Sequence, residues 1–184
     1  MVYALRNGRR VVALLSFLLL CCGVHVHARV AVKTNTLGWL TASPNVEAEF
    51  VLGRHISLNM GVAANPISTD NFKTTFTHFQ PEVRYWLNRP MVSHFLGVTA
   101  FANNFNMLVK DVHHKGDALA VGLTYGYAWV LNDHWNIEAT AGIGVMRYRQ
   151  FKYDKGAPKP DAANDSKTTL APVKLGVSFV YIIR

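Results

Sequence analysis

The chain has very little cysteine and no long apolar segment outside its N-terminus. Only Cys21 and Cys22 occur among its 184 residues, and both lie in a segment that we expect to be removed. The mature chain would then have no disulfide and no thiol chemistry. The apolar run of residues 11–22 is too short for a transmembrane helix, which needs about 20 residues, and no other continuous apolar run is long enough. These absences argue against a disulfide-stabilised domain and against a helical membrane protein.

Motifs that would identify an enzyme or a nucleic-acid-binding protein are also missing. The sequence contains no Gly-x-Ser-x-Gly, phosphate-binding-loop or zinc-ligand pattern. It has no basic helix or RNA-binding motif either, so we expect no nucleic-acid partner. Without the three N-terminal arginines, 16 Lys and Arg remain against 11 Asp and Glu, a net charge of +5. This charge fits either an ordinary solubilising surface or contact with the phosphates of lipopolysaccharide and anionic lipid.

The N-terminal segment has the organisation of a secretory signal peptide. Three arginines precede the apolar run of residues 11–22, and Val26-His27-Ala28 is an acceptable small-residue cleavage site. Bulky leucines stand directly before Cys21, where lipid attachment requires small residues. We therefore predict a cleaved signal peptide over residues 1–28 and one domain over residues 29–184.

What the chain has instead is a regular alternation of large apolar and small residues. In residues 119–129 every second side chain is large, as a run of Leu119, Val121, Leu123, Tyr125, Tyr127 and Trp129. The side chains between them are alanine, glycine and threonine. A sheet in water buries one face and carries charge on the other. The pattern seen here is typical of a strand with lipid outside and a narrow barrel interior.

Segments of this kind predict eight strands, at residues 30–39, 45–52, 56–65, 78–87, 93–105, 119–129, 135–148 and 170–183. Pro81 cannot donate to a strand ladder and predicts a bulge. Short turns follow strands two, four and six, whereas polar loops follow strands three, five and seven, at residues 66–77, 107–116 and 150–168. Outer-membrane barrels have short periplasmic turns and longer extracellular loops. We therefore predict an all-β fold, an eight-stranded antiparallel transmembrane β-barrel with these three loops on the extracellular side.

The alternation also assigns side chains to the interior and to the strand ends. Charges of both signs fall on the interior face. Eight strands leave a lumen just wide enough for side chains, so these charges most simply form a paired network. The predicted network consists of Lys33, Glu47, Glu49, Glu82, Arg84, Glu138 and Lys174. Aromatic residues near the strand ends are expected to form two belts at the membrane interfaces. The predicted belts include Trp39, Phe50, Trp86, Tyr127, Trp129, Trp135, Tyr148 and Tyr181.

Basic residues gather in and beside the longest predicted loop. Those expected to contact lipopolysaccharide or a protein partner are Arg147, Arg149, Lys152, Lys155 and Lys159. Histidines occur at the start of a predicted strand, at His78, and in the loop of residues 107–116, at His113-His114, but no fixed ligand spacing or acidic partner defines a site. We therefore expect surface histidines, no bound metal and no cofactor.

Several stretches of the chain carry a resemblance to a known family. They are Lys33-Thr34-Asn35, the QPEVRYWL stretch of residues 80–87, residues 122–139 and the C-terminal Tyr181-Ile182-Ile183-Arg184. With these stretches the mature chain resembles an uncharacterised family of small outer-membrane β-barrel proteins from the Bacteroidetes. The resemblance implies no catalytic residue, because the family has none established. It also implies a link to fimbria-like surface proteins, whose genes often lie near those of the family.

Three functions follow as hypotheses. The leading one is a non-enzymatic barrel in the outer membrane of a Gram-negative bacterium, with a structural, surface-display or partner-binding role through its loops. Its partners would be outer-membrane lipid, lipopolysaccharide, the barrel-assembly machinery and a surface or fimbrial protein. The second is an enzyme that modifies lipid A or phospholipid, which would require a polar cluster on the outward face, where only Arg147 is found. The third is a narrow transport pore, against which the filled lumen argues.

Overall fold

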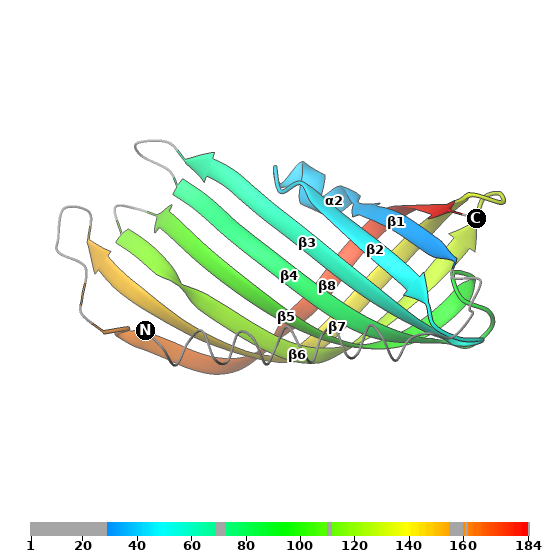
Figure 1. Ribbon diagram of the computed structural model, residues 1–184. Helices are drawn as coiled ribbons and strands as arrows, with labels where there is room; N and C mark the ends of the chain where they lie inside the picture. Colours follow the sequence, from blue (N-terminus) through cyan, green and yellow to red (C-terminus); the bar gives the residue numbers. More distant parts are fainter. Residues whose placement is uncertain (1–28, 69–72, 110–111, 155–159, 161, 184) are drawn as a thin grey trace, which may run out of the picture.

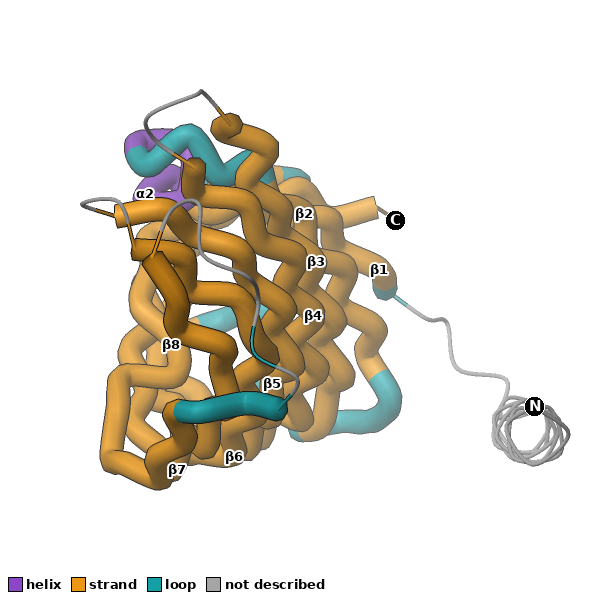
Figure 2. The backbone as a smooth tube through the Cα atoms, turned by 90° about the vertical axis from the view of Figure 1, so that its left-hand side faces the viewer, coloured by secondary structure: helices purple, strands orange, loops and turns teal. Residues whose placement is uncertain are grey.

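The computed structural model of the protein describes residues 29–68, 73–109, 112–154, 160 and 162–183, and the predicted signal peptide lies outside them. The described chain forms β1 (Val30–Asn35), α2 (Thr36–Leu40), β2 (Asn45–Val51), β3 (Ile56–Ser68), β4 (Lys73–Trp86), β5 (Ser93–Val109), β6 (Val112–Val130), β7 (Trp135–Asp154) and β8 (Asp165–Ile183). Each strand pairs antiparallel with the next, and β8 pairs with β1, so that one sheet closes on itself (Figures 1 and 2). The prediction of eight antiparallel strands is confirmed.

The closed sheet has two different ends. At one end, which we call the turn end, short connections join β2 to β3, β4 to β5 and β6 to β7. Val30 pairs with Ile183 at this end, so both ends of the described chain lie there. At the other end, the loop end, α2 follows β1, and the connections from β3 to β4, β5 to β6 and β7 to β8 are made (Figure 1).

The polarity of the sheet is the inverse of that of a water-soluble domain. Interior side chains such as Arg84 and Lys33 are at most 2% exposed. Large apolar side chains on the outer face, such as Leu123 and Leu175, are 65% exposed. Apolar residues pack inside the sheet in two small groups near the turn end, one of which contains Trp86 and Phe95.

The three predicted polar loops are shorter than expected because their flanking strands continue past the apolar region. β3 and β4 stay paired as far as Ser68 and Lys73. β5 and β6 stay paired as far as Val109 and Val112, inside the predicted loop of residues 107–116. β7 reaches Asp154, and Gln150 pairs with Asp165. Backbone hydrogen bonds continue these ladders although the apolar alternation has ended, so the sequence pattern underestimates strand length.

The first predicted strand is too long, because β1 ends at Asn35 and the chain turns into the short helix α2. The Asn35 side chain accepts a hydrogen bond from the backbone N–H of Leu37 at 3.0 Å and so caps the helix. Asn45 in turn accepts from the backbone N–H of Asn35 at 2.6 Å. These asparagine contacts end the strand four residues before Trp39.

The predicted bulge at Pro81 is also wrong, because the β4–β5 pairing skips Gln80 and Pro81 but resumes in the same register at Glu82 and Thr99. Pro81 lies opposite Met60 in an unbroken ladder between β3 and β4. The irregularity is in β8, where Gly142 pairs with Lys174 but Ile143 pairs with Pro172. Val173 is therefore an extra residue, and it is buried, only 5% exposed, although alternation from Leu175 would place it outside.

Val173 fills space that glycines leave open on the neighbouring strands. A Cβ added to Gly122 would lie 2.7 Å from a Val173 methyl, 2.5 Å from the Ile143 carbonyl oxygen and 2.8 Å from the Gly144 Cα. Gly122→Val should therefore lower the free energy of unfolding by about 1–3 kcal/mol, since backbone atoms must move. Chemical denaturation followed by circular dichroism would measure the loss. Val121→Leu, on the open outer face, should change stability by less than about 0.5 kcal/mol, and equal effects of the two substitutions would contradict this packing.

Candidate functional site

The interior of the sheet is crossed by a network of charged side chains, with Arg84 of β4 at its centre. Its Nη1 atom lies 2.9 Å from a Glu138 carboxylate oxygen and 3.1 Å from one of Glu49, and its Nη2 atom lies 2.8 Å from Glu82. The guanidinium carbon is also 4.3 Å from the centre of the Phe95 ring. Three carboxylates and one aromatic face therefore surround a fully buried cation.

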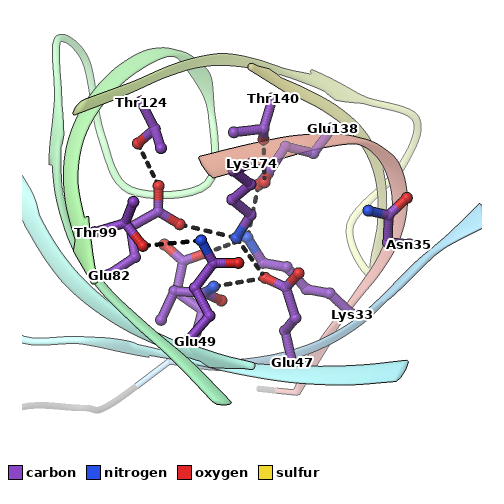
Figure 3. A network of polar contacts seen from close by, with 12 residues as sticks. Lys33, Asn35, Glu47, Glu49, Glu82, Thr99, Thr124, Glu138, Thr140 and Lys174 are labelled. Carbon is purple, nitrogen blue, oxygen red and sulfur yellow. Dashed lines mark hydrogen bonds and ion pairs between the residues drawn. The ribbon is translucent and has the colours of Figure 1, made fainter. Parts of the chain in front are cut away.

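Two lysines complete the ion pairs. The Lys33 ammonium lies 2.6 Å from Glu138 and also contacts Glu49, and both pairs are almost fully buried. The Lys174 ammonium bridges Glu47 at 2.9 Å and Glu82 at 3.0 Å (Figure 3). The structure thus brings together, inside the sheet, all seven residues that the sequence assigns to the interior network.

The network has four carboxylates but only three cations. Neutral side chains supply further hydrogen bonds to the carboxylates. Ser57 and Thr124 donate hydrogen bonds to Glu49 and Glu82, respectively. Asn59 donates to Glu47 at 2.6 Å, and Thr140 donates to Glu138 at 3.1 Å. Every carboxylate therefore has both a cation and a neutral donor. Such satisfaction is what buried charges require.

Small residues across the sheet make room for these long side chains. A Cβ at Gly61 would lie 3.1 Å from the Cγ atom of Glu47, and one at Gly97 would lie 2.7 Å from a Glu82 carboxylate oxygen. The role of Gly61 cannot be recognised without the strand register, which places Gly61 opposite Glu47 across the β2–β3 ladder. The charges of this network come from five strands. They are almost completely buried, except that Glu47 and Lys174 line a cavity of about 560 Å³ toward the loop end.

Most of the predicted belt residues lie on the outer face, and most of these lie at the turn end. Trp129, Trp135 and Tyr181 are exposed by 41–48%, and Phe50 and Tyr127 lie on the same face. Trp39 is 57% exposed, but it lies on α2 at the loop end.

Two predicted belt residues belong elsewhere. Trp86 is completely buried inside the sheet, where its ring packs 4.7 Å from that of Phe95 and its Nε1–H donates to Ser57 at 2.8 Å. It shares the strand face of Arg84, so the alternation that placed Arg84 inside also places Trp86 there. Tyr148 lies on the face of β7 that carries Glu138, not on the outer face, because β7 keeps its alternation without a break.

Histidines that the sequence reasoning missed lie beside the outward-facing tyrosines of the turn end. His55 stacks on Tyr85, His134 stacks on Tyr181, and His94 lies within 2.6 Å of the Tyr125 hydroxyl. The signal was present in the sequence, because two of these histidines directly precede a strand. These three histidines lie beside the aromatic residues of this end. His94 also forms a polar pair with Tyr125 on the outer face.

The predicted basic contact residues separate into two faces. Arg147 and Arg149 are exposed on the outer face of β7, and Arg149 lies 3.5 Å from Asp117. Lys152 lies on the opposite strand face, and its backbone exchanges two 2.8 Å hydrogen bonds with the Asn164 side chain. Lys155 and Lys159 lie outside the described residues.

The described residues offer no cluster of three or more His, Cys, Asp or Glu side chains that could hold a metal ion. His78 points toward the interior beside Phe101, whereas His113 stacks on Tyr153, so the histidines considered from the sequence do not converge. Within the same residues, no helix is both long and apolar enough to cross a membrane.

Comparison with curated proteins finds no match. One family model matches residues 12–183, which is nearly the whole chain and includes every strand of the closed sheet. The chain therefore belongs to the family of proteins of unknown function DUF3575.

Proposed function

We propose that this protein is a β-barrel of the outer membrane of a Gram-negative bacterium, of the type that the sequence resembles in the Bacteroidetes. The observation that carries the proposal is the inverted polarity of the closed sheet. Its outer face exposes large apolar side chains from all eight strands, while its charges are buried inside. In water this outer face would be an exposed apolar surface far larger than soluble monomers carry. In a bilayer it is the expected surface.

The height of the apolar face supports this proposal. On β6 the large outward side chains run from Leu119 to Trp129, which is ten residue steps. At about 3.4 Å per step these span about 34 Å along the strand. With a typical strand tilt of about 40°, the height along the barrel axis is about 26 Å, close to the apolar band of about 25 Å in outer-membrane barrels.

The order of the side chains across the sheet indicates where this apolar face ends. On the outer face, the paired residues Val62, Phe79, Ala102 and Leu119 form one row across β3–β6. One row closer to the loop end lie Ala64, Thr77, Asn104 and Asp117. The outer face of β4–β6 therefore changes from apolar to polar residues toward the loop end, as expected where strands leave the apolar band of a membrane.

The packed interior favours a structural, surface-display or partner-binding role over transport or catalysis. The buried ion pairs around Arg84 fill the interior, which argues against a path for ions. We therefore propose that the protein is not an enzyme and acts through its loop end. This end would be extracellular and would contact lipopolysaccharide and a surface or fimbrial protein. Residues 1–28 would direct export, and the barrel-assembly machinery would insert the strands.

Labelling of single cysteines on intact cells tests the topology. Cysteine at Ala163, in the β7–β8 connection, should react with a membrane-impermeant maleimide, whereas cysteine at Arg54, in the β2–β3 turn, should react only after lysis. Both parent side chains are exposed, so access to solvent alone does not distinguish them. Equal labelling of the two variants on intact cells would argue against insertion, and the opposite pattern would invert the topology.

A further inference from the structure

We propose that the outer wall of the sheet binds one phosphorylated, acylated lipid, lipid A, in an apolar groove at the loop end. The groove has a volume of about 860 Å³ and crosses β2–β6. Its lining includes Trp39, Val46, Ala64, Phe79, Ala102 and Leu119. This inference rests on the proposed outer-membrane location, and it adds a defined site and ligand class to it.

The groove exists because small side chains interrupt the large ones on this part of the outer face. Ala102 lies between Phe79 and Leu119 in one row of paired residues, and Ala64 lies in the next row. Trp39, on α2, lies at one end of the lining. Four strand spacings of about 4.8 Å give a length of about 19 Å. Because barrel strands tilt by roughly 40°, a groove that crosses them is inclined to the membrane plane. An acyl chain that enters from the interface follows such an inclined path.

The charge beside the groove indicates an anionic head group. At the β6 side, Leu119 pairs with Arg147 and Asp117 pairs with Arg149, so both arginines lie next to the lining. Lys115 lies two residues before Asp117 and is also exposed. Asp117 compensates only one of these three cations, through its 3.5 Å contact with Arg149. Arginine binds phosphate, as it binds carboxylate, through two parallel N–H donors, so a phosphorylated head group fits these side chains.

The position of the groove selects the lipid. It lies at the row where apolar residues give way to polar ones, at the loop end, which the proposed topology places in the outer leaflet. Lipid A supplies both acyl chains and phosphates in that leaflet. A phospholipid of the inner leaflet would meet the turn end, which this groove does not reach.

Native mass spectrometry of the detergent-folded protein with bisphosphorylated lipid A tests the inference. Ala102→Trp, which fills the groove, should weaken binding at least tenfold. Ala100→Trp is the matched control, because Ala100 also faces outward on β5 but does not line the groove, and it should change binding less than twofold. Arg147→Gln should weaken binding of bisphosphorylated lipid A several-fold and leave dephosphorylated lipid A unaffected.

Equal binding by Ala102→Trp and the unaltered protein would overturn the groove site. Equal binding of phosphatidylglycerol and lipid A would overturn the choice of ligand. Ala64→Leu provides a second way to narrow the groove if Ala102→Trp does not fold. Insertion into lipid vesicles, measured separately by protease protection, tests the outer-membrane proposal. A protein that inserts but does not bind lipid A would overturn only the groove site, whereas a protein that does not insert would overturn the proposed function.

Discussion

Replacing Arg84 with leucine should destabilise the folded protein by about 3–5 kcal/mol, the usual cost of removing one partner from a buried ion pair. Arg84 is fully buried and is the cation shared by Glu49, Glu82 and Glu138. Without it, four interior carboxylates would face only Lys33 and Lys174. Thermal or denaturant unfolding of the detergent-folded protein would measure the loss, as would a reduced yield of folded barrel.

Arg149→Leu is the matched control for this prediction. Arg149 is also an arginine in an ion pair, but its side chain is 62% exposed, and exposed pairs contribute at most about 1 kcal/mol. A second test adds Glu138→Gln to Arg84→Leu, which removes one uncompensated charge and should recover part of the stability. Unchanged stability of Arg84→Leu would show that the interior charges are not held as a mutually dependent network.

Introducing a charge at the middle of the outer face should have the second-largest effect. Leu123 is 65% exposed and lies at the centre of the six large outward residues of β6. If this face meets lipid, Leu123→Arg should oppose folding into vesicles by about 2–4 kcal/mol, because arginine near the bilayer midplane is costly. If the face met water, the same substitution would be neutral, since surface changes alter stability by less than about 0.5 kcal/mol.

Leu131→Arg makes the same chemical change at the turn end, where Leu131 is 57% exposed in the β6–β7 turn. Near the interface the cost should fall to about 0–1 kcal/mol. Equilibrium folding into phospholipid vesicles, followed by tryptophan fluorescence, would compare the two variants. A cost that is the same at both positions would count against a membrane-embedded barrel.

The sequence by itself determined the number of strands and which face of most strands carries the charges. A period of two needs no knowledge of neighbours, so Glu82 and Arg84 could be assigned to the same face from their spacing alone. The same spacing places Trp86 inside, whereas its aromatic side chain predicts a position in the outer belt. The structure shows that position was the better guide.

Only the tertiary structure decided where the strands end, where the ladder slips and which charges touch. Asn35 stops β1 through contacts with Asn45 and Leu37, of which the first joins residues on two different strands. The extra residue Val173 turns inward because facing glycines leave space for it. The contact of Lys33 with Glu138 joins residues 105 positions apart. Alternation is a property of a single strand, whereas these features depend on register between strands, which the closure of the sheet fixes.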